Sequence, residues 1–206
     1  MAQAPDRTVG PGPGVDDGER DSALIARMGA GDTRAFADLV GRHLGAVLSV
    51  SRRMLGDDAE AEDVAQETML KLWRLADGLA IGPAGVRPWL RRVAGNLCID
   101  RIRRRAQTEV TDAPPEVPVA PGQMRALDDR DRAARVEQAL QALPDRQRLA
   151  LVLFHYEGLS QIEIADQMGI GDEAVESLLA RARRSLRRSL ETDWRALLGD
   201  QAGEGV

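Results

Sequence analysis

The sequence has few of the residues on which disulfides, metal sites and covalent catalysis depend. It contains one cysteine, Cys98, and two histidines, so an internal disulfide and a CxxC metal site are excluded. His43 and His155 have no ligand cluster near them in the sequence. There is no Walker loop, GxSxG elbow or HExxH motif. We therefore expect no catalytic residue, no metal and no cofactor, and so not an enzyme.

Aromatic residues and long apolar runs are also scarce. The chain has two phenylalanines, three tryptophans and one tyrosine in 206 residues. This composition favours helices built on Leu, Ala and Val over a β-sandwich. No run approaches the ~18 apolar residues of a membrane-spanning helix, and the N-terminus lacks a secretory signal. We expect an all-α protein of the cytoplasm with no membrane insertion.

The charge is distributed unevenly. The formal net charge of −5 argues against nucleic acid as a partner. However, residues 86–105 hold seven arginines and one acid, whereas residues 57–67 hold six acids and no basic residue. Separate acidic and basic patches indicate two different partners.

Proline, glycine and helical periodicity divide the chain. Residues 1–20 read as a disordered tail, and residues 21–105 as a small helical domain. Four prolines without apolar periodicity make residues 106–126 a flexible linker. Residues 127–198 read as a second small helical domain, and residues 199–206 as a second disordered tail.

The acidic stretch lies on a predicted helix with two faces. The apolar stripe expected to face the core consists of Ala65, Met69, Leu72 and Ala76. Acids at a helix start complement the macrodipole, but Asp63 and Glu67 lie a turn or more inside, with Gln66 between them. On chemistry alone, a docking face for a basic partner and a solvated acidic face are equally open.

The arginine-rich stretch predicts another helix, from about Arg87 or Pro88 to Arg104. The residues expected to be buried in it are Leu90, Val93, Leu97 and Ile102. Asn96 carries both a donor and an acceptor, and it can bond an unstacked base while neighbouring arginines hold phosphates. The alternative is a surface asparagine among solvated arginines. Trp89 can stack on a base, although packing at the helix start is favoured.

Residues 160–188 carry the signature of a helix-turn-helix. Ser160 and Glu163 form a capping box, and Gly169 suits the positive φ of a sharp turn. Ile162, Ala165 and Met168 are expected to face inward on the first helix. The second helix continues into a row of arginines suited to phosphate contacts. The alternative is an ordinary amphipathic hairpin with a solvated basic face.

Three segments in this order resemble bacterial sigma factors of the extracytoplasmic-function (ECF) group of the sigma-70 family. They are DAEAEDVAQETMLKLW, RPWLRRVAGNLCIDRIRRR and LPDRQRLALVLFHYEGLSQIEIADQMGIGDEAVESLLARARRSLRR. The resemblance covers about residues 21–190. It implies a protein that binds core RNA polymerase, at the clamp of the β′ subunit and the flap of the β subunit. It further implies promoter recognition, DNA melting, transcription initiation and control by an anti-sigma factor.

The resemblance also assigns roles to residues. Those implied in core polymerase binding are Asp63, Gln66 and Glu67. Those implied in binding the −10 element are Trp89, Arg92, Asn96, Asp100, Arg103 and Arg104, with the preceding loop, about residues 78–86, as the other wall of a pocket for a flipped base. Those implied in binding the −35 element are Glu173, Glu176, Ser177, Arg181, Arg183 and Arg184.

This chain departs from the family pattern in its recognition helix. Glu176 and Leu178 stand where the family usually has a lysine and an arginine, and Glu173 adds a further acid. Two other functions therefore stay open. One is a sigma-like decoy that sequesters an anti-sigma factor, and the other is a stand-alone helix-turn-helix transcription regulator.

Overall fold

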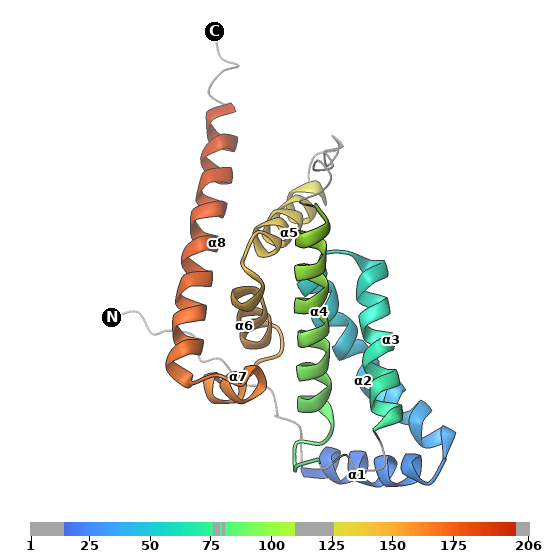
Figure 1. Cartoon of the computed structure of the whole chain (residues 1–206). Helices are drawn as coiled ribbons and strands as arrows, with labels where there is room; N and C mark the ends of the chain where they lie inside the picture. Colours follow the sequence, from blue (N-terminus) through green and yellow to red (C-terminus); the bar gives the residue numbers. More distant parts are fainter. Residues whose placement is uncertain (1–14, 76–78, 80, 110–125, 201–206) are drawn as a thin grey trace.

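The structure is a computed structural model that describes residues 15–75, 79, 81–109 and 126–200. Within these ranges the chain forms eight α-helices, and the only β-type pairing there is a bridge between Gly82 and Gly85 (Figure 1). The all-α fold predicted from the composition is confirmed. Most of the expected linker, residues 110–125, lies outside the described residues.

The first half of the chain is a helical bundle with a helix across its end. Its elements are α1 (Val15–Gly29), α2 (Thr33–Leu55), α3 (Asp58–Arg74) and α4 (Arg87–Glu109). The Asp32 carboxylate accepts two backbone N–H bonds at the start of α2, and Gly56 ends this helix with φ 66°. Asp57 then caps α3. These caps fix the α2–α3 corner, while α1 crosses the base of the bundle (Figure 1).

The second half contains the predicted helix-turn-helix. Its elements are α5 (Ala126–Gln141), α6 (Asp145–His155), α7 (Gln161–Met168) and α8 (Asp172–Asp200). The Ser160 hydroxyl accepts from the Glu163 N–H, and the Glu163 carboxylate accepts from the Ser160 N–H. Gly169 ends α7 with φ 63°. The predicted capping box and glycine turn are confirmed.

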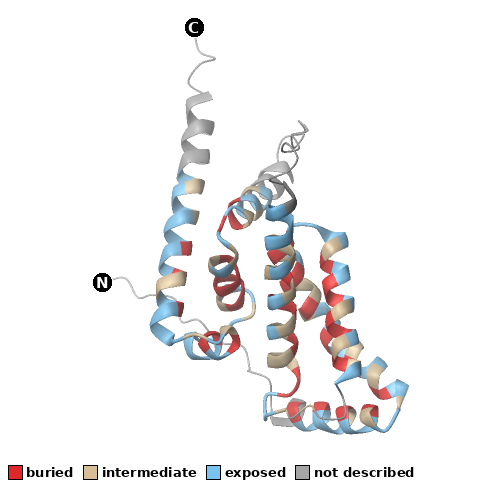
Figure 2. Ribbon diagram, viewed as in Figure 1, coloured by how far each residue is buried: buried red, intermediate tan, exposed pale blue. Residues whose placement is uncertain are grey.

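The two halves share one continuous core. Helices α5 and α6 contact α2, and α6 and α7 contact α4, so buried residues line both sides of the junction (Figure 2). Arg148 of α6 is buried there and donates to the carbonyl oxygens of Met54, Gln141 and Leu143. Its guanidinium therefore ties the end of α2 to the α5–α6 corner.

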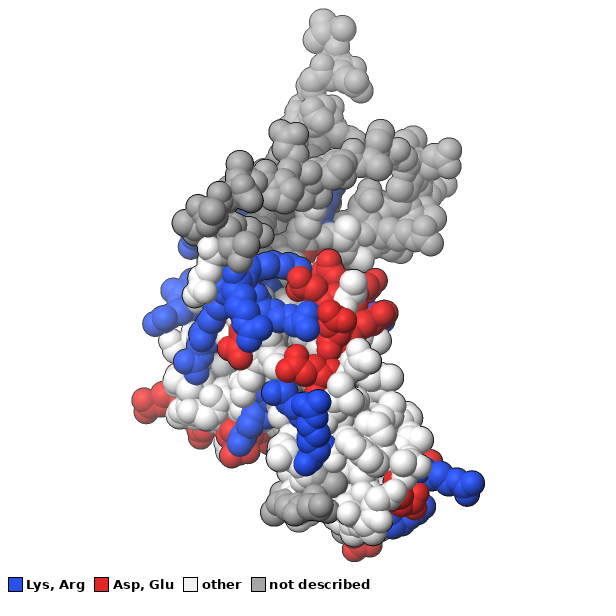
Figure 3. All heavy atoms as spheres, turned by 45° about the vertical axis from the view of Figure 1, so that its right-hand side comes forward, with Lys and Arg blue, Asp and Glu red and all other residues white. Residues whose placement is uncertain are grey.

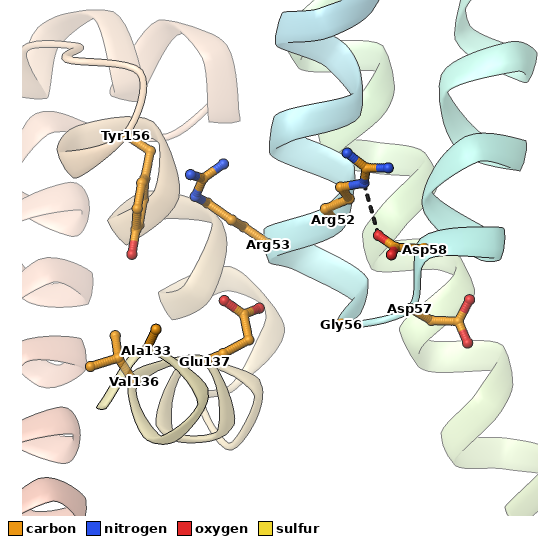
Figure 4. Close-up of a pocket in the computed structure, with 9 residues that line it drawn as sticks. All are labelled: Arg52, Arg53, Gly56, Asp57, Asp58, Ala133, Val136, Glu137 and Tyr156. Atoms are coloured by element: carbon orange, nitrogen blue, oxygen red, sulfur yellow. Dashed lines mark ion pairs between the residues drawn. The ribbon is translucent and has the colours of Figure 1, made fainter. Parts of the chain in front are cut away.

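A cavity of about 610 Å³ opens at the edge of this junction, between α2, α3, α5 and α6 (Figure 4). The Arg53 guanidinium lies 4.0 Å from the centroid of the Tyr156 ring, which joins α2 to the end of α6. Across the cavity, Arg52 pairs with Asp58 at 2.8 Å. The edge of the contact between the two halves is therefore open and carries charged side chains.

Helix α1 begins earlier than expected. Residues 15–20, which the sequence placed in a disordered tail, are helical. The reason is tertiary, because Gly18 packs against the backbone of Pro83 and Asp21 is 1% exposed. Local composition does not reveal a partner so far away in the sequence.

Helix α8 also runs further than expected and ends at Asp200, inside the expected tail 199–206. The remaining tail, like residues 1–14, lies outside the described residues. Among the described helices, none combines the length and apolar character that crossing a bilayer requires.

The buried face of α7 differs from the prediction. Ala165 is buried as predicted, but Ile162 is 70% exposed and Ile164 is fully buried instead. An eight-residue helix has only about two turns, so its apolar residues fit more than one stripe. Packing against α6 and α8 selects the stripe that contains Ile164.

The buried face of α4 also differs. Leu90 is buried as expected, but Ala94 and Cys98 complete the core, and the other predicted core residues are only partly buried. These two small side chains allow α4 to lie close to α2. On α3, Ala65, Met69 and Leu72 are buried as predicted, and Ala76 lies outside the described residues.

Candidate functional site

The acidic face of α3 (Asp63, Gln66 and Glu67) is exposed. The side chains of Asp63 and Glu67 retain 65% and 44% of their accessible area. The Asp63 carboxylate lies 3.4 Å from the Arg101 guanidinium, and the Glu67 carboxylate lies 3.6 Å from the Lys71 ammonium group. Acidic side chains gather beside basic ones on this side of the molecule (Figure 3). The face is therefore available to a basic partner, and helix capping does not account for it.

The arginine face of α4 (Arg92, Asn96, Asp100 and Arg103) points toward the second half of the chain. Spacings of three and four residues place these side chains in one row along the helix. Arg92 donates to the backbone oxygen of Asp166 and lies 3.4 Å from its carboxylate. Arg103 pairs with Asp145 at 3.1 Å. Acids from α6 and α7 therefore engage both arginines of this row.

A cavity of about 330 Å³ lies between this row and the second half. Its lining residues are Asn96, Ile99, Asp100, Arg103, Arg146, Leu149 and Met168. Leu149 packs against α4 at Gly95, where a Cβ atom would come within 3.1 Å of it. The Asn96 amide thus borders a confined space whose opposite wall carries the cationic Arg146.

A buried ion pair closes the contact between α4 and the second half. Arg91 lies 2.6 Å from the Glu157 carboxylate, and the two side chains are 10% and 9% exposed. Sequence reasoning missed this pair, because the partners are 66 residues apart and neither stands in a distinctive local pattern. Asp145 and Asp166 escaped notice for the same reason.

The other two residues expected at the −10 element lie toward the two ends of α4. Trp89 is partly buried against the core at the start of α4. Arg104 is exposed near the end of the helix. The neighbouring Arg101 and Arg105 instead turn to α3, where Arg105 pairs with Glu60 at 2.7 Å.

The outer face of α8 carries the second set of predicted DNA contacts. Five of these residues are exposed: Glu173, Glu176, Arg181, Arg183 and Arg184. Ser177 is partly buried, and the Arg183 guanidinium lies 5.0 Å from the centroid of the Phe154 ring. Buried Val175, Leu179 and Ala182 hold the opposite side of α8 against the bundle. In Figure 1, α8 stands on the far side of the molecule from α3.

The described residues hold no group of three or more His, Cys, Asp or Glu side chains suited to a metal ion. Burial raises the pKa of the Cys98 thiol to about 12. A thiol with that pKa stays protonated at neutral pH and is a poor nucleophile.

The sequence matches both conserved regions of a known family. Residues 39–108 match Sigma-70 region 2, and residues 133–186 match Sigma-70, region 4. The RNA polymerase sigma-H factor of Pseudomonas aeruginosa is 34% identical over 184 residues, which cover 84% of this chain and 95% of that protein. The ECF RNA polymerase sigma factor SigW of Bacillus subtilis is 33% identical over 179 residues, covering 81% and 94%.

Two solved structures share the fold. CnrH in complex with the cytosolic domain of CnrY aligns with a TM-score of 0.59 and 31% identity, covering 84% of this chain and 99% of that one. The sigma factor RpoE in complex with the anti-sigma factor NepR, from Bartonella quintana, aligns with a TM-score of 0.60 and 26% identity, covering 77% and 98%.

Proposed function

Since this chain belongs to the ECF group of the sigma-70 family and is a promoter-specific initiation factor that binds RNA polymerase, we propose that its three charged surfaces divide that work. The acidic face of α3 binds the polymerase, the arginine face of α4 reads the −10 element, and the outer face of α8 reads the −35 element. Residues 21–105 and 127–198 act as two units joined by the intervening linker.

The acidic face docks on a basic surface of the polymerase, the clamp of the β′ subunit. The exposure of Asp63 and Glu67 supports this assignment, because two accessible carboxylates on one helix face attract a basic partner. The second unit contacts the flap of the β subunit. The factor then contributes binding energy to the polymerase and no catalytic residue of its own.

Docking is tested by reversing the charge of that face. We expect Asp63→Arg with Glu67→Arg to abolish co-purification with core polymerase, since attraction becomes repulsion at two contacts. Asp38→Arg is the matched control, because Asp38 is an exposed acid of α2 away from this face. Co-purification equal to that of the control rules out the docking assignment.

When the arginine face of α4 binds DNA, phosphates replace the carboxylates that now pair with its arginines. Arg92 and Arg103 now pair with carboxylates of the second half, and a phosphate uses the same guanidinium donors. Asn96 then bonds a base taken out of the stack, a step that costs a few kcal/mol. Binding therefore requires the two halves to move apart, which places the −10 and −35 readers on separate stretches of promoter.

The linker is long enough for this movement. Residues 110–125 span up to about 50 Å when extended, more than one turn of B-DNA at about 34 Å. On α8, Arg181 and Arg184 bind phosphates, while Glu173 and Glu176 are placed to accept from cytosine amino groups. Glu173 and Glu176 therefore change the −35 sequence that α8 prefers and do not abolish its binding to DNA.

An anti-sigma factor is a further partner of this chain. RpoE is solved with the anti-sigma factor NepR, and CnrH with the cytosolic domain of CnrY, which supports the same kind of regulation here. The protein acts where the polymerase does, in the cytoplasm. A stand-alone regulator would need no polymerase, and the docking face argues against it.

Transcription in vitro tests the whole proposal. Purified core polymerase and fragmented genomic DNA are combined with and without this protein, and the transcripts are sequenced. We expect new start sites that share two upstream motifs. Intact core binding without any new start site would instead favour a decoy that sequesters an anti-sigma factor.

A further inference from the structure

A buried carboxylate lies behind the loop that leads into α4. Asp21 of α1 is 1% exposed, and its Oδ2 accepts from the backbone N–H of Val86 at 3.1 Å. Its Oδ1 accepts from His43 Nε2 at 3.0 Å and from Arg42 Nε at 3.2 Å. Three donors from two other parts of the chain therefore converge on one side chain.

Val86 is the residue through which this network reaches α4. Its carbonyl oxygen accepts from the N–H of Leu90 at 3.0 Å, which is the first turn of the helix. Asp21 thus holds the residue at the very start of α4. Asn96 lies ten residues further along this rigid helix, at about 15 Å. A shift at Val86 therefore moves both the loop and the base-reading row.

The loop is also pressed directly against α1. A Cβ atom on Gly18 would lie 2.0 Å from the carbonyl oxygen of Pro83, and one on Gly85 would lie 2.4 Å from Asp21 Oδ2. Figure 1 shows α1 crossing the base of the bundle at this loop. Two glycines and one carboxylate therefore fix how closely α1 and the loop approach.

A simple stabilising role does not require this arrangement. Helices α1 and α2 already pack through apolar residues such as Ile25, Met28 and Leu39. The only backbone group that Asp21 holds outside those two helices, among the described residues, is the N–H at the start of α4. The network is thus directed at the loop and at α4.

We propose that Asp21 is a positioning residue for −10 recognition. It never touches DNA, but it sets the position of the loop at residues 81–86 relative to the start of α4, and hence which base is accepted between this loop and the α4 row that carries Asn96. This inference rests on the proposed role of α4, and the experiment below separates the two.

The test compares affinities for single-stranded DNA. Holoenzyme is titrated with a fluorescent oligonucleotide that carries the non-template −10 sequence of a promoter found by transcription in vitro, and with copies changed at one base. Fluorescence anisotropy measures each affinity. The readout is the affinity for the cognate oligonucleotide divided by the affinity for the copy with one changed base. Uniform loss of folded protein lowers all affinities but leaves this ratio unchanged.

Asp21→Asn keeps the shape of the side chain but replaces one acceptor oxygen with an NH₂ donor, so one converging N–H group faces another donor. Gly18→Ala pushes the loop away from the same face of α1, because its Cβ atom would clash with the carbonyl oxygen of Pro83, while it improves the helix propensity of α1. We expect both to lower the ratio about tenfold, as misplacement of a binding group does, with core binding and −35 duplex binding unchanged.

Gly45→Ala is the matched control, because it makes the same change in α2, outside the loop and α4, with open space around its Cβ position. It should keep the ratio. If Asp21→Asn fails to fold, Gly18→Ala alone decides. The proposal is overturned if Asp21→Asn and Gly18→Ala, or whichever of the two folds, keep the affinity ratio of the unchanged protein.

Asn96→Ala in the same assay tests the underlying function. If this variant keeps the ratio while Asp21→Asn lowers it, the assignment of Asn96 fails and the positioning role of Asp21 stands. If Asn96→Ala lowers the ratio and both Asp21→Asn and Gly18→Ala keep it, −10 reading by α4 stands and the positioning role is wrong.

Discussion

The arginines of α4 and those of α8 look alike in the sequence but have different surroundings in the fold. On α4, Arg91, Arg92 and Arg103 are paired with acids of the second half. On α8, Arg181 and Arg184 are exposed, and within the described part of the chain no acid pairs with either. If both helices bind DNA as proposed, the arginines of α4 exchange partners first, whereas those of α8 are already exposed.

The difference indicates an order of events. Phosphates bind an exposed guanidinium row without prior rearrangement, so α8 can contact DNA in the closed form. The α4 row must first lose two exposed ion pairs, worth about 0–1 kcal/mol each, and one buried pair. Opening also separates the core that α2 and α4 share with α5, α6 and α7, so binding to polymerase and DNA must supply the free energy of that separation.

The largest expected effect comes from the buried pair. Glu157→Gln leaves Arg91 buried without its counter-charge, which should lower the free energy of unfolding by about 3 kcal/mol. Urea unfolding measures it. Asp166→Asn, which removes an exposed partner of Arg92, is the control and should cost less than about 1 kcal/mol. Equal costs would mean that burial does not distinguish these two pairs.

The second effect is on the closed form itself. Asp145→Lys with Asp166→Lys sets like charges against Arg103 and Arg92 and should open the molecule, seen as a larger radius of gyration in X-ray scattering. Glu173→Lys with Glu176→Lys makes the same charge change on the exposed face of α8 and should leave the radius unchanged. An identical radius in both double variants would mean that the exposed pairs do not hold the halves together.

A smaller effect is expected at the exposed arginines of α8. Arg181→Ala should weaken −35 duplex binding by a similar factor for all sequences and reduce the salt slope by about one unit. The exposed Arg34 of α2, changed to alanine, provides the control. A loss confined to one promoter sequence would show that Arg181 reads a base and not a phosphate.

The smallest effect concerns the cap of α7, the helix that carries Asp166. Hydrogen bonds from the Ser160 hydroxyl and N–H, at 2.7 and 2.8 Å, hold the pKa of Glu163 below its usual 4.5. The ionised carboxylate is therefore the stabilising form. Its contribution is present above the unfolded pKa and is lost as the pH falls through the lower folded value.

This cap gives a pH test. Glu163→Gln should be less stable than the unchanged protein at about pH 7, by less than about 1 kcal/mol because the site is exposed, and the two should converge as the pH falls through the lowered pKa of Glu163. Thermal unfolding at a series of pH values from about pH 7 downward measures the difference. A gap that persists at the lowest pH would show that charge is not the cause.

Sequence reasoning succeeded where interactions are local. The capping box at Ser160 and the glycine turn at Gly169 join residues within one helical turn, so a few letters predict them. The exposed acidic face of α3 followed from the same periodicity. The choice between Ile162 and Ile164 failed, because a short helix leaves its buried stripe to its neighbours.

By itself, the sequence determined the all-α fold class, the capped turn between α7 and α8, and the family to which the chain belongs, since each depends on contacts within a few residues or on letters in order. Only the tertiary structure decided that acids of α6 and α7 pair with the arginine row of α4, and that Asp21 lies behind Val86. These contacts join residues 42 to 74 positions apart. Packing brings them together, and no local pattern encodes such distant partners.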